Sequence, residues 1–86
     1  MKSFSYTVQD PVGIHARPAG LLVKAAKEFA DTEITIAKDG KAVKATQLMK
    51  LMGLGVKSGD TVTVTAEGAS EDAAIAAMEQ FFQANL

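Results

Sequence analysis

The sequence contains no cysteine, and this absence excludes disulfide bonds and zinc sites built on thiolates. Packing must therefore supply the stability of the fold, and the cytoplasm is the natural compartment for such a chain. Long apolar runs are also missing, because no segment approaches the roughly 18 consecutive apolar residues of a membrane span. The polar start, residues 1–5, lacks the apolar run of a signal peptide. We therefore expect a soluble cytoplasmic protein with no membrane insertion.

The chain also lacks an excess of charge of one sign, since nine basic and ten acidic residues give a formal net charge of -1. No basic run and no aromatic-rich strand suited to stacking bases is present, so nucleic acid is not an expected partner. The 86 residues fit one domain, residues 1–86, and leave no room for a second substrate domain or a closed nucleotide cleft.

Histidine is scarce as well, because His15 is the only one. No carboxylate cluster at ligand spacing accompanies it, so we expect neither a metal nor a cofactor. No serine lies in a nucleophile-elbow pattern, which argues against a hydrolytic triad.

The residues that are present follow clear periodicities. Alternation of apolar and polar residues predicts four strands, around residues 4–8, 33–36, 42–43 and 62–66. Apolar positions at helical spacing predict helices over residues 16–29, 47–52 and 71–82, with Thr46 and Ser70 placed to cap the second and third. Asp39 and Gly40 supply the positive φ angles of a tight hairpin turn between the second and third strands.

The order of elements is therefore β-α-β-β-α-β-α. Strands with one polar face and helices with apolar stripes predict a two-layer α+β fold with all three helices on one side of a four-stranded sheet. A right-handed crossover through the first helix leaves a gap between the first two strands. The last strand can fill this gap and make the sheet antiparallel.

One segment carries chemistry, and it joins the first strand to the first helix. Pro18 is tolerated in the first helical turn, which places His15 at or next to the N-cap. The first amides of the helix, at Ala16 and Arg17, have no backbone partner and attract an anion such as a phosphoryl group on His15. The same field favours the neutral imidazole that attacks phosphorus, and Arg17 adds a planar fork of donors for phosphate oxygens. The alternative is that His15 is only a cap, a surface residue or a hydrogen-bonded core residue.

The run Gly13-Ile14-His15-Ala16-Arg17-Pro18-Ala19 resembles the active-site signature of HPr, the histidine-containing phosphocarrier of the bacterial phosphoenolpyruvate-dependent sugar phosphotransferase system. The likeness extends over essentially the whole chain and includes the Asp39-Gly40-Lys41 turn. It implies an open-faced β-sandwich and a monomer. It also implies that enzyme I phosphorylates His15 on Nδ1 and that sugar-specific IIA proteins receive the group. Such a protein is a carrier with a phosphohistidine intermediate rather than a conventional enzyme.

The chain departs from this family at two positions. Relatives usually carry Ser or Asn where this chain has Val12, so one polar neighbour of the site is missing. In many relatives an ATP-dependent kinase phosphorylates a serine at the start of the short helix, and Gln47 occupies the matching position here. Gln47 has no hydroxyl to phosphorylate, and the neighbouring Thr46 is interpreted as an N-cap.

A carrier needs an exposed apolar surface near its active residue to dock on several proteins. The expected partner surface consists of apolar residues on the short helix and residues on the flank of the first helix: Leu48, Met49, Leu51, Met52, Gly20, Lys24 and Lys27. Methionine adapts to several partners, and the lysines would attract acidic ones. The alternative for the apolar residues is a place in the core.

Other functions remain open at this stage. Within the family, the alternative is a paralogous carrier of a nitrogen-related or regulatory phosphotransfer branch. Outside it, the alternatives are a non-catalytic α+β module that holds a small anion and a structural interaction domain that uses only the Met-rich surface. Acceptance of phosphate from phosphoenolpyruvate and enzyme I distinguishes a carrier from both.

Overall fold

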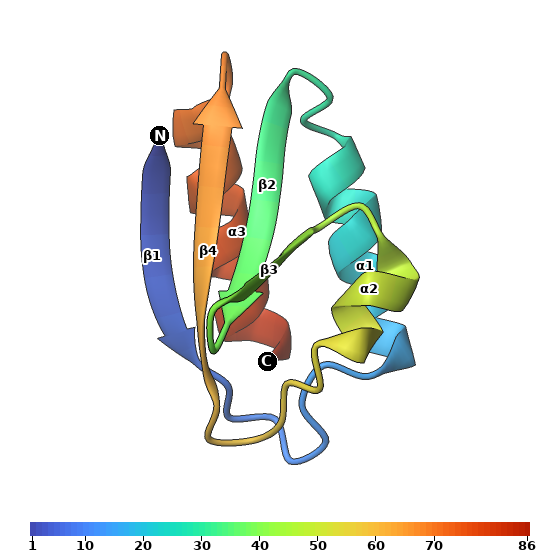
Figure 1. The fold of residues 1–86 in the computed structure, drawn as a ribbon. Helices are drawn as coiled ribbons and strands as arrows, with labels where there is room; N and C mark the ends of the chain where they lie inside the picture. The colour runs from blue at the N-terminus through green and yellow to red at the C-terminus, as the bar shows by residue number, and fades with distance from the viewer.

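The four strands of the computed structural model, which describes residues 1–86, form one antiparallel sheet in the order β1-β4-β2-β3. The elements along the chain are β1 (Lys2–Thr7), α1 (Ala16–Lys27), β2 (Thr32–Lys38), β3 (Lys41–Lys44), α2 (Leu48–Gly53), β4 (Thr61–Gly68) and α3 (Glu71–Asn85). β4 lies between β1 and β2, as the crossover argument predicted (Figure 1). The predicted order of elements and the α+β class are confirmed.

The alternation of side chains decides which face of the sheet is buried. In β4, Val62, Val64 and Ala66 are fully buried, while the threonines between them lie on the open face. The Asp39-Gly40 turn has φ angles of 51° and 83°, and Lys38 pairs with Lys41 across it. Two consecutive positive φ angles make this the type I′ hairpin that the dipeptide predicted.

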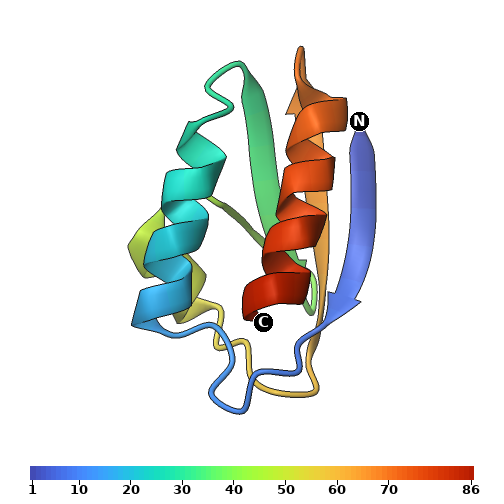
Figure 2. The ribbon, with the colours of Figure 1, turned by 180° about the vertical axis from the view of Figure 1, so that it is seen from behind.

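The helices cover one face of this sheet, and the other face is open (Figures 1 and 2). α1 and α3 lie side by side across the sheet, and α2 packs beside α1 near β3. Phe82 of α3 is fully buried and meets the rings of Phe4 and Tyr6 edge-on, at centroid distances of 5.9 and 5.5 Å. The core therefore lies between the sheet and the two long helices. None of the three helices has the length and apolar content needed to cross a membrane.

Three predicted details of the helix ends are wrong. α1 ends at Lys27 rather than Phe29, because the Phe29 amide donates to the carbonyl three residues earlier, that of Ala26, at 3.1 Å. Thr46 does not cap α2, because it lies in the turn that follows β3. Gln47 is the N-cap of α2, and its side chain makes no capping hydrogen bond. Ser70 is the N-cap of α3, but its hydroxyl donates to Asp31 Oδ2 at 3.0 Å instead of accepting from a helix amide. For Ser70 the competing partner, Asp31, lies outside the helix.

Candidate functional site

His15 is the N-cap of α1, as predicted, with φ -110° and ψ -174°. Its side chain is half-buried and makes no capping bond, so the ring is free for other contacts. The following amides, at Ala16 and Arg17, belong to the first turn and have no acceptor inside the helix. An anion on the imidazole would therefore meet unsatisfied N–H groups and the positive end of the helix dipole.

The loop before His15 is held tightly against the segment after α2. The amide of Ile14 donates to the Val56 carbonyl at 3.1 Å. Gly13 has a φ of 80°, and a Cβ at this position would lie 2.2 Å from the Val56 oxygen. Only glycine permits both this backbone conformation and this close approach. The contact fixes the direction from which the chain enters α1.

The segment that supports Gly13 is itself held by an ion pair. Lys38 Nζ lies 2.9 Å from Asp60 Oδ2 and donates to the Gly55 carbonyl at 2.9 Å. The hydrogen bond from Lys38 and a second one from the Lys57 amide hold the pKa of Asp60 below its usual value. β2 is thereby linked to residues 55–60, and through them to the His15 loop.

On its other side the His15 loop is held by the end of the chain. The amides of Gln9 and Asp10 donate to the Leu86 carbonyl oxygen at 2.6 and 2.7 Å. The Leu86 side chain is buried in the core, which anchors this contact. Residues from both ends of the sequence therefore meet beside His15.

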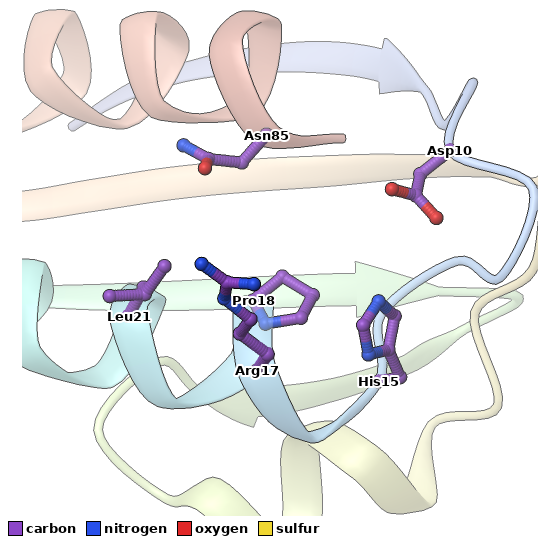
Figure 3. Close-up of a pocket in the computed structure, with 6 residues that line it drawn as sticks. All are labelled: Asp10, His15, Arg17, Pro18, Leu21 and Asn85. Atoms are coloured by element: carbon purple, nitrogen blue, oxygen red, sulfur yellow. The ribbon is translucent and has the colours of Figure 1, made fainter.

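An open pocket of about 260 Å³ lies beside the histidine (Figure 3). Its lining residues come from the loop, α1 and the last turn of α3: Asp10, His15, Arg17, Pro18, Leu21 and Asn85. The structure thus brings His15 and Arg17 together, with the Arg17 guanidinium extending into the space between α1 and α3 (Figure 3). Arg17 forms no ion pair within the protein, so its donors are available to an anion.

Two pocket residues, Asp10 and Asn85, were not among the residues selected from the sequence. The sequence could have indicated Asp10, since it is a carboxylate in the same loop as His15. No sequence pattern indicates Asn85 as a site residue, because it reaches the pocket only through the packing of α3 against the rest of the fold.

The predicted partner surface is only partly exposed. Leu48, Met49 and Met52 are exposed, with 38%, 78% and 39% of their surface accessible. Leu51 is fully buried in the core cluster, so the prediction that it contacts partners is wrong. A two-turn helix that packs on a domain must turn one side inward, and Leu51 lies on that side. Lys24 and Lys27 are exposed on α1, Gly20 is half-buried there, and α1 contacts α2.

The groups around His15 suit a phosphoryl group. No group of three His, Cys, Asp or Glu side chains is placed to hold a metal ion. A nucleophilic imidazole, free helix amides and an unpaired guanidinium are the components that accept a phosphoryl group and stabilise its charge.

Comparison with known proteins agrees with this geometry. The family model "PTS HPr component phosphorylation site" matches residues 2–84. Phosphocarrier protein HPr of Mycoplasma genitalium is 38% identical over 85 residues, which cover 99% of this chain and 97% of the relative. The crystal structure of HPr-C-His from Thermoanaerobacter tengcongensis superposes with a TM-score of 0.92 at 38% identity, covering 98% of this chain and 93% of that one. A crystal structure of an HPr dimer from the same organism gives 0.76 at 38% identity, covering 98% and 95%.

The match spans nearly the whole sequence, the fold agrees strand for strand, and the signature run lies at the N-terminus of α1 beside an open pocket. The chain therefore belongs to the HPr family, the phosphocarrier proteins of the phosphotransferase system.

Proposed function

We propose that His15 accepts a phosphoryl group from phosphorylated enzyme I and passes it to sugar-specific IIA proteins in the cytoplasm. The observation that carries this proposal is the position of His15 at the N-cap of α1, with the unpaired Arg17 in the same open pocket. The pocket is shallow and reaches solvent, as a group that must meet two successive partners requires. The whole chain, residues 1–86, acts as one carrier domain in this scheme.

The transfer exchanges one phosphorus–nitrogen bond for another. The lone pair on Nδ1 of His15 attacks phosphorus, and the bond to the donor nitrogen breaks with its electron pair returning to the donor. The hydrogen on Nε2 of His15 leaves to solvent as the new bond forms, and the donor imidazole takes up one proton, so each phosphorylated ring is neutral. The amides of Ala16 and Arg17 and the Arg17 guanidinium stabilise the phosphoryl oxygens during the exchange. The donor and the acceptor use the same site, so the chain carries the group without a bound cofactor.

The docking surface in this proposal consists of Gly20, Lys24, Lys27, Leu48, Met49 and Met52. Its centre is apolar, and its lysines suit partners with acidic surfaces. The carrier acts as a monomer in this proposal. A native mass spectrum of the unphosphorylated protein tests the monomer.

Incubation with enzyme I and labelled phosphoenolpyruvate tests the central step. The wild-type chain should gain one acid-labile, base-stable phosphate, and His15→Ala should gain none. The variant should keep its fold, because the ring makes no capping bond and is only half-buried. Circular dichroism and thermal unfolding provide that control. Labelling of a folded His15→Ala protein would refute the assignment, and an unlabelled wild type that still binds phosphate would indicate an anion-binding module.

A further inference from the structure

Asp10 is held in one orientation by three hydrogen bonds. Its amide donates to the Leu86 carbonyl at 2.7 Å, its carbonyl accepts from the Gly13 amide at 3.0 Å, and its Oδ1 accepts from the Val12 amide at 2.9 Å. The residue is half-buried between the end of α3 and the His15 loop. One of the three bonds reaches the carboxylate itself, and it favours the rotamer in which Oδ1 faces the Val12 amide.

The second carboxylate oxygen, Oδ2, has no partner within the protein and is free to face the pocket. Figure 3 shows the Asp10 carboxylate and the His15 ring directed toward one another across the pocket, while Arg17 reaches the pocket from α1, on the same side as His15. The pocket therefore presents the Asp10 carboxylate and the Arg17 guanidinium to whatever His15 carries. The Val12 amide is already occupied by Asp10 Oδ1, so it offers no hydrogen bond to that group.

A carboxylate beside a phosphoryl group disfavours the phosphorylated state relative to the unphosphorylated one. The unphosphorylated imidazole is neutral when it attacks, so Asp10 does not oppose it at that stage. The phosphoryl group bound to His15 carries nearly two negative charges, and Asp10 then repels it. The repulsion is relieved whenever the group leaves.

We propose that Asp10 raises the phosphoryl transfer potential of this chain, so that its phosphohistidine is a better donor than it would be without the carboxylate. The proposal rests on the proposed function of His15. In transfer, the bond from phosphorus to Nδ1 breaks, its electron pair stays on the imidazole, and the ring takes up a proton at Nε2, while the acceptor's nucleophile forms the new bond and releases a proton. In spontaneous hydrolysis, water forms the new bond to phosphorus, one of its protons goes to the imidazole, and the other stays on the phosphate. Both reactions remove the dianion from the field of Asp10.

Asp10→Asn tests the charge while it keeps the geometry, because the amide oxygen can still accept from the Val12 amide. The equilibrium between phosphorylated enzyme I and this chain should shift toward the phosphorylated chain by about three- to tenfold in a solvent-open pocket. The isolated phosphorylated protein should hydrolyse more slowly by a similar factor. Labelled phosphoenolpyruvate supplies the phosphate, and the labelled fraction is followed over time.

Asp72→Asn is the matched control, since it removes one carboxylate at the far end of α3, where the side chain is 83% exposed. It should leave the equilibrium and the hydrolysis rate unchanged. Raising the salt concentration from about 0.1 M to about 1 M shortens the Debye length from about 10 to about 3 Å, and the difference between wild type and Asp10→Asn should shrink accordingly. A positional role for Asp10 would not respond to salt in this way.

Three results would overturn the inference: no difference between wild type and Asp10→Asn, an equal shift in Asp72→Asn, or a shift that salt does not reduce. Each of these requires a wild-type chain that accepts phosphate. A wild type that accepts none would instead refute the proposed function, so the two failures are distinguishable. Exchange protection of the Ile14 amide, measured in both proteins, verifies that the loop has kept its position.

Discussion

Gly13 lies where the loop before His15 runs against Val56 and Lys57, with a φ of 80°. Gly13→Ala places a Cβ 2.2 Å from the Val56 oxygen and 2.7 Å from the Lys57 Cα, and both are backbone atoms that cannot swing away. We expect a loss of about 2 kcal/mol or more in the free energy of unfolding, from the strained φ and the displaced loop. We also expect slower phosphate acceptance, because the entry into α1 shifts. Urea unfolding and labelling from enzyme I measure the two effects.

Gly20 is the control for this substitution. It lies inside α1, and a Cβ there would meet nothing within 4 Å. Gly20→Ala should stabilise the protein by up to about 1 kcal/mol, since alanine favours the helix. If Gly13→Ala unfolds at the same urea concentration as Gly20→Ala, the close approach to Val56 does not hold the loop.

At the scale of the element, α2 begins without a side-chain cap, because Gln47 occupies the N-cap and makes no bond. Gln47→Ser supplies the missing acceptor and should raise stability by about 0.5 to 1 kcal/mol. It also restores the hydroxyl that the regulatory kinase of serine-bearing relatives would modify. We expect ATP and such a kinase to phosphorylate Gln47→Ser and to leave the wild type unmodified, which mass spectrometry detects. In the modified variant, nearly two negative charges beside Leu48 would weaken docking of acidic partners.

The wild-type result depends on Thr46, the one hydroxyl next to this position. Thr46 is exposed and does not cap α2, so the structure does not shield it from a kinase. Phosphate found on Thr46 would contradict the expectation that the kinase leaves the wild-type carrier unmodified. Modification of Gln47→Ser alone, with normal labelling of His15 in both proteins, would support it.

At the scale of the molecule, two carboxylates link segments that are distant in the sequence. Asp60 pairs with Lys38, and Glu71 pairs with the N-terminal amino group at 2.9 Å. The pKa of Asp60 is lowered from its ordinary 3.8, chiefly by Lys38, and the pKa of Glu71 from its ordinary 4.5, chiefly by the amino terminus. Both carboxylates are partly exposed to solvent, so salt weakens the pairs.

A lowered pKa in the folded state means that the unfolded chain binds more protons in the range between the two pKa values. The stabilisation from these groups is therefore complete above the unfolded values and is lost as pH falls through the folded ones. We expect the free energy of unfolding from urea titrations to be level from pH 7 to about 5 and to fall below about pH 4.5. The double variant Asp60→Asn, Glu71→Gln should show a shallower fall. Parallel curves for the two proteins would mean that other groups cause the acid sensitivity.

Much of this protein follows from local sequence. The alternation in residues 61–66 decides which side chains of β4 face the core, and Asp39-Gly40 decides the hairpin, because each requires only neighbouring backbone angles. The position of His15 at the N-cap of α1 follows from Pro18 in the same way, since a proline without an N–H is accommodated only in the first turn. These features could be predicted because the interactions that decide them span a few residues.

The tertiary structure alone decided the rest. Leu51 turned inward and Met49 outward because α2 packs against the domain on one side, which no two-turn apolar pattern reveals. The hydrogen bond from the Ser70 hydroxyl to Asp31 and the close contact of Gly13 with Val56 join residues that are distant in the chain and adjacent in space. Local sequence patterns do not reveal such contacts. Asn85 and Asp10 joined the pocket of His15 for the same reason: the end of α3 returns to the first loop only when the whole sheet and its helices have packed. Sequence singled out the residue that we propose to carry the phosphoryl group, and packing determined which groups surround it.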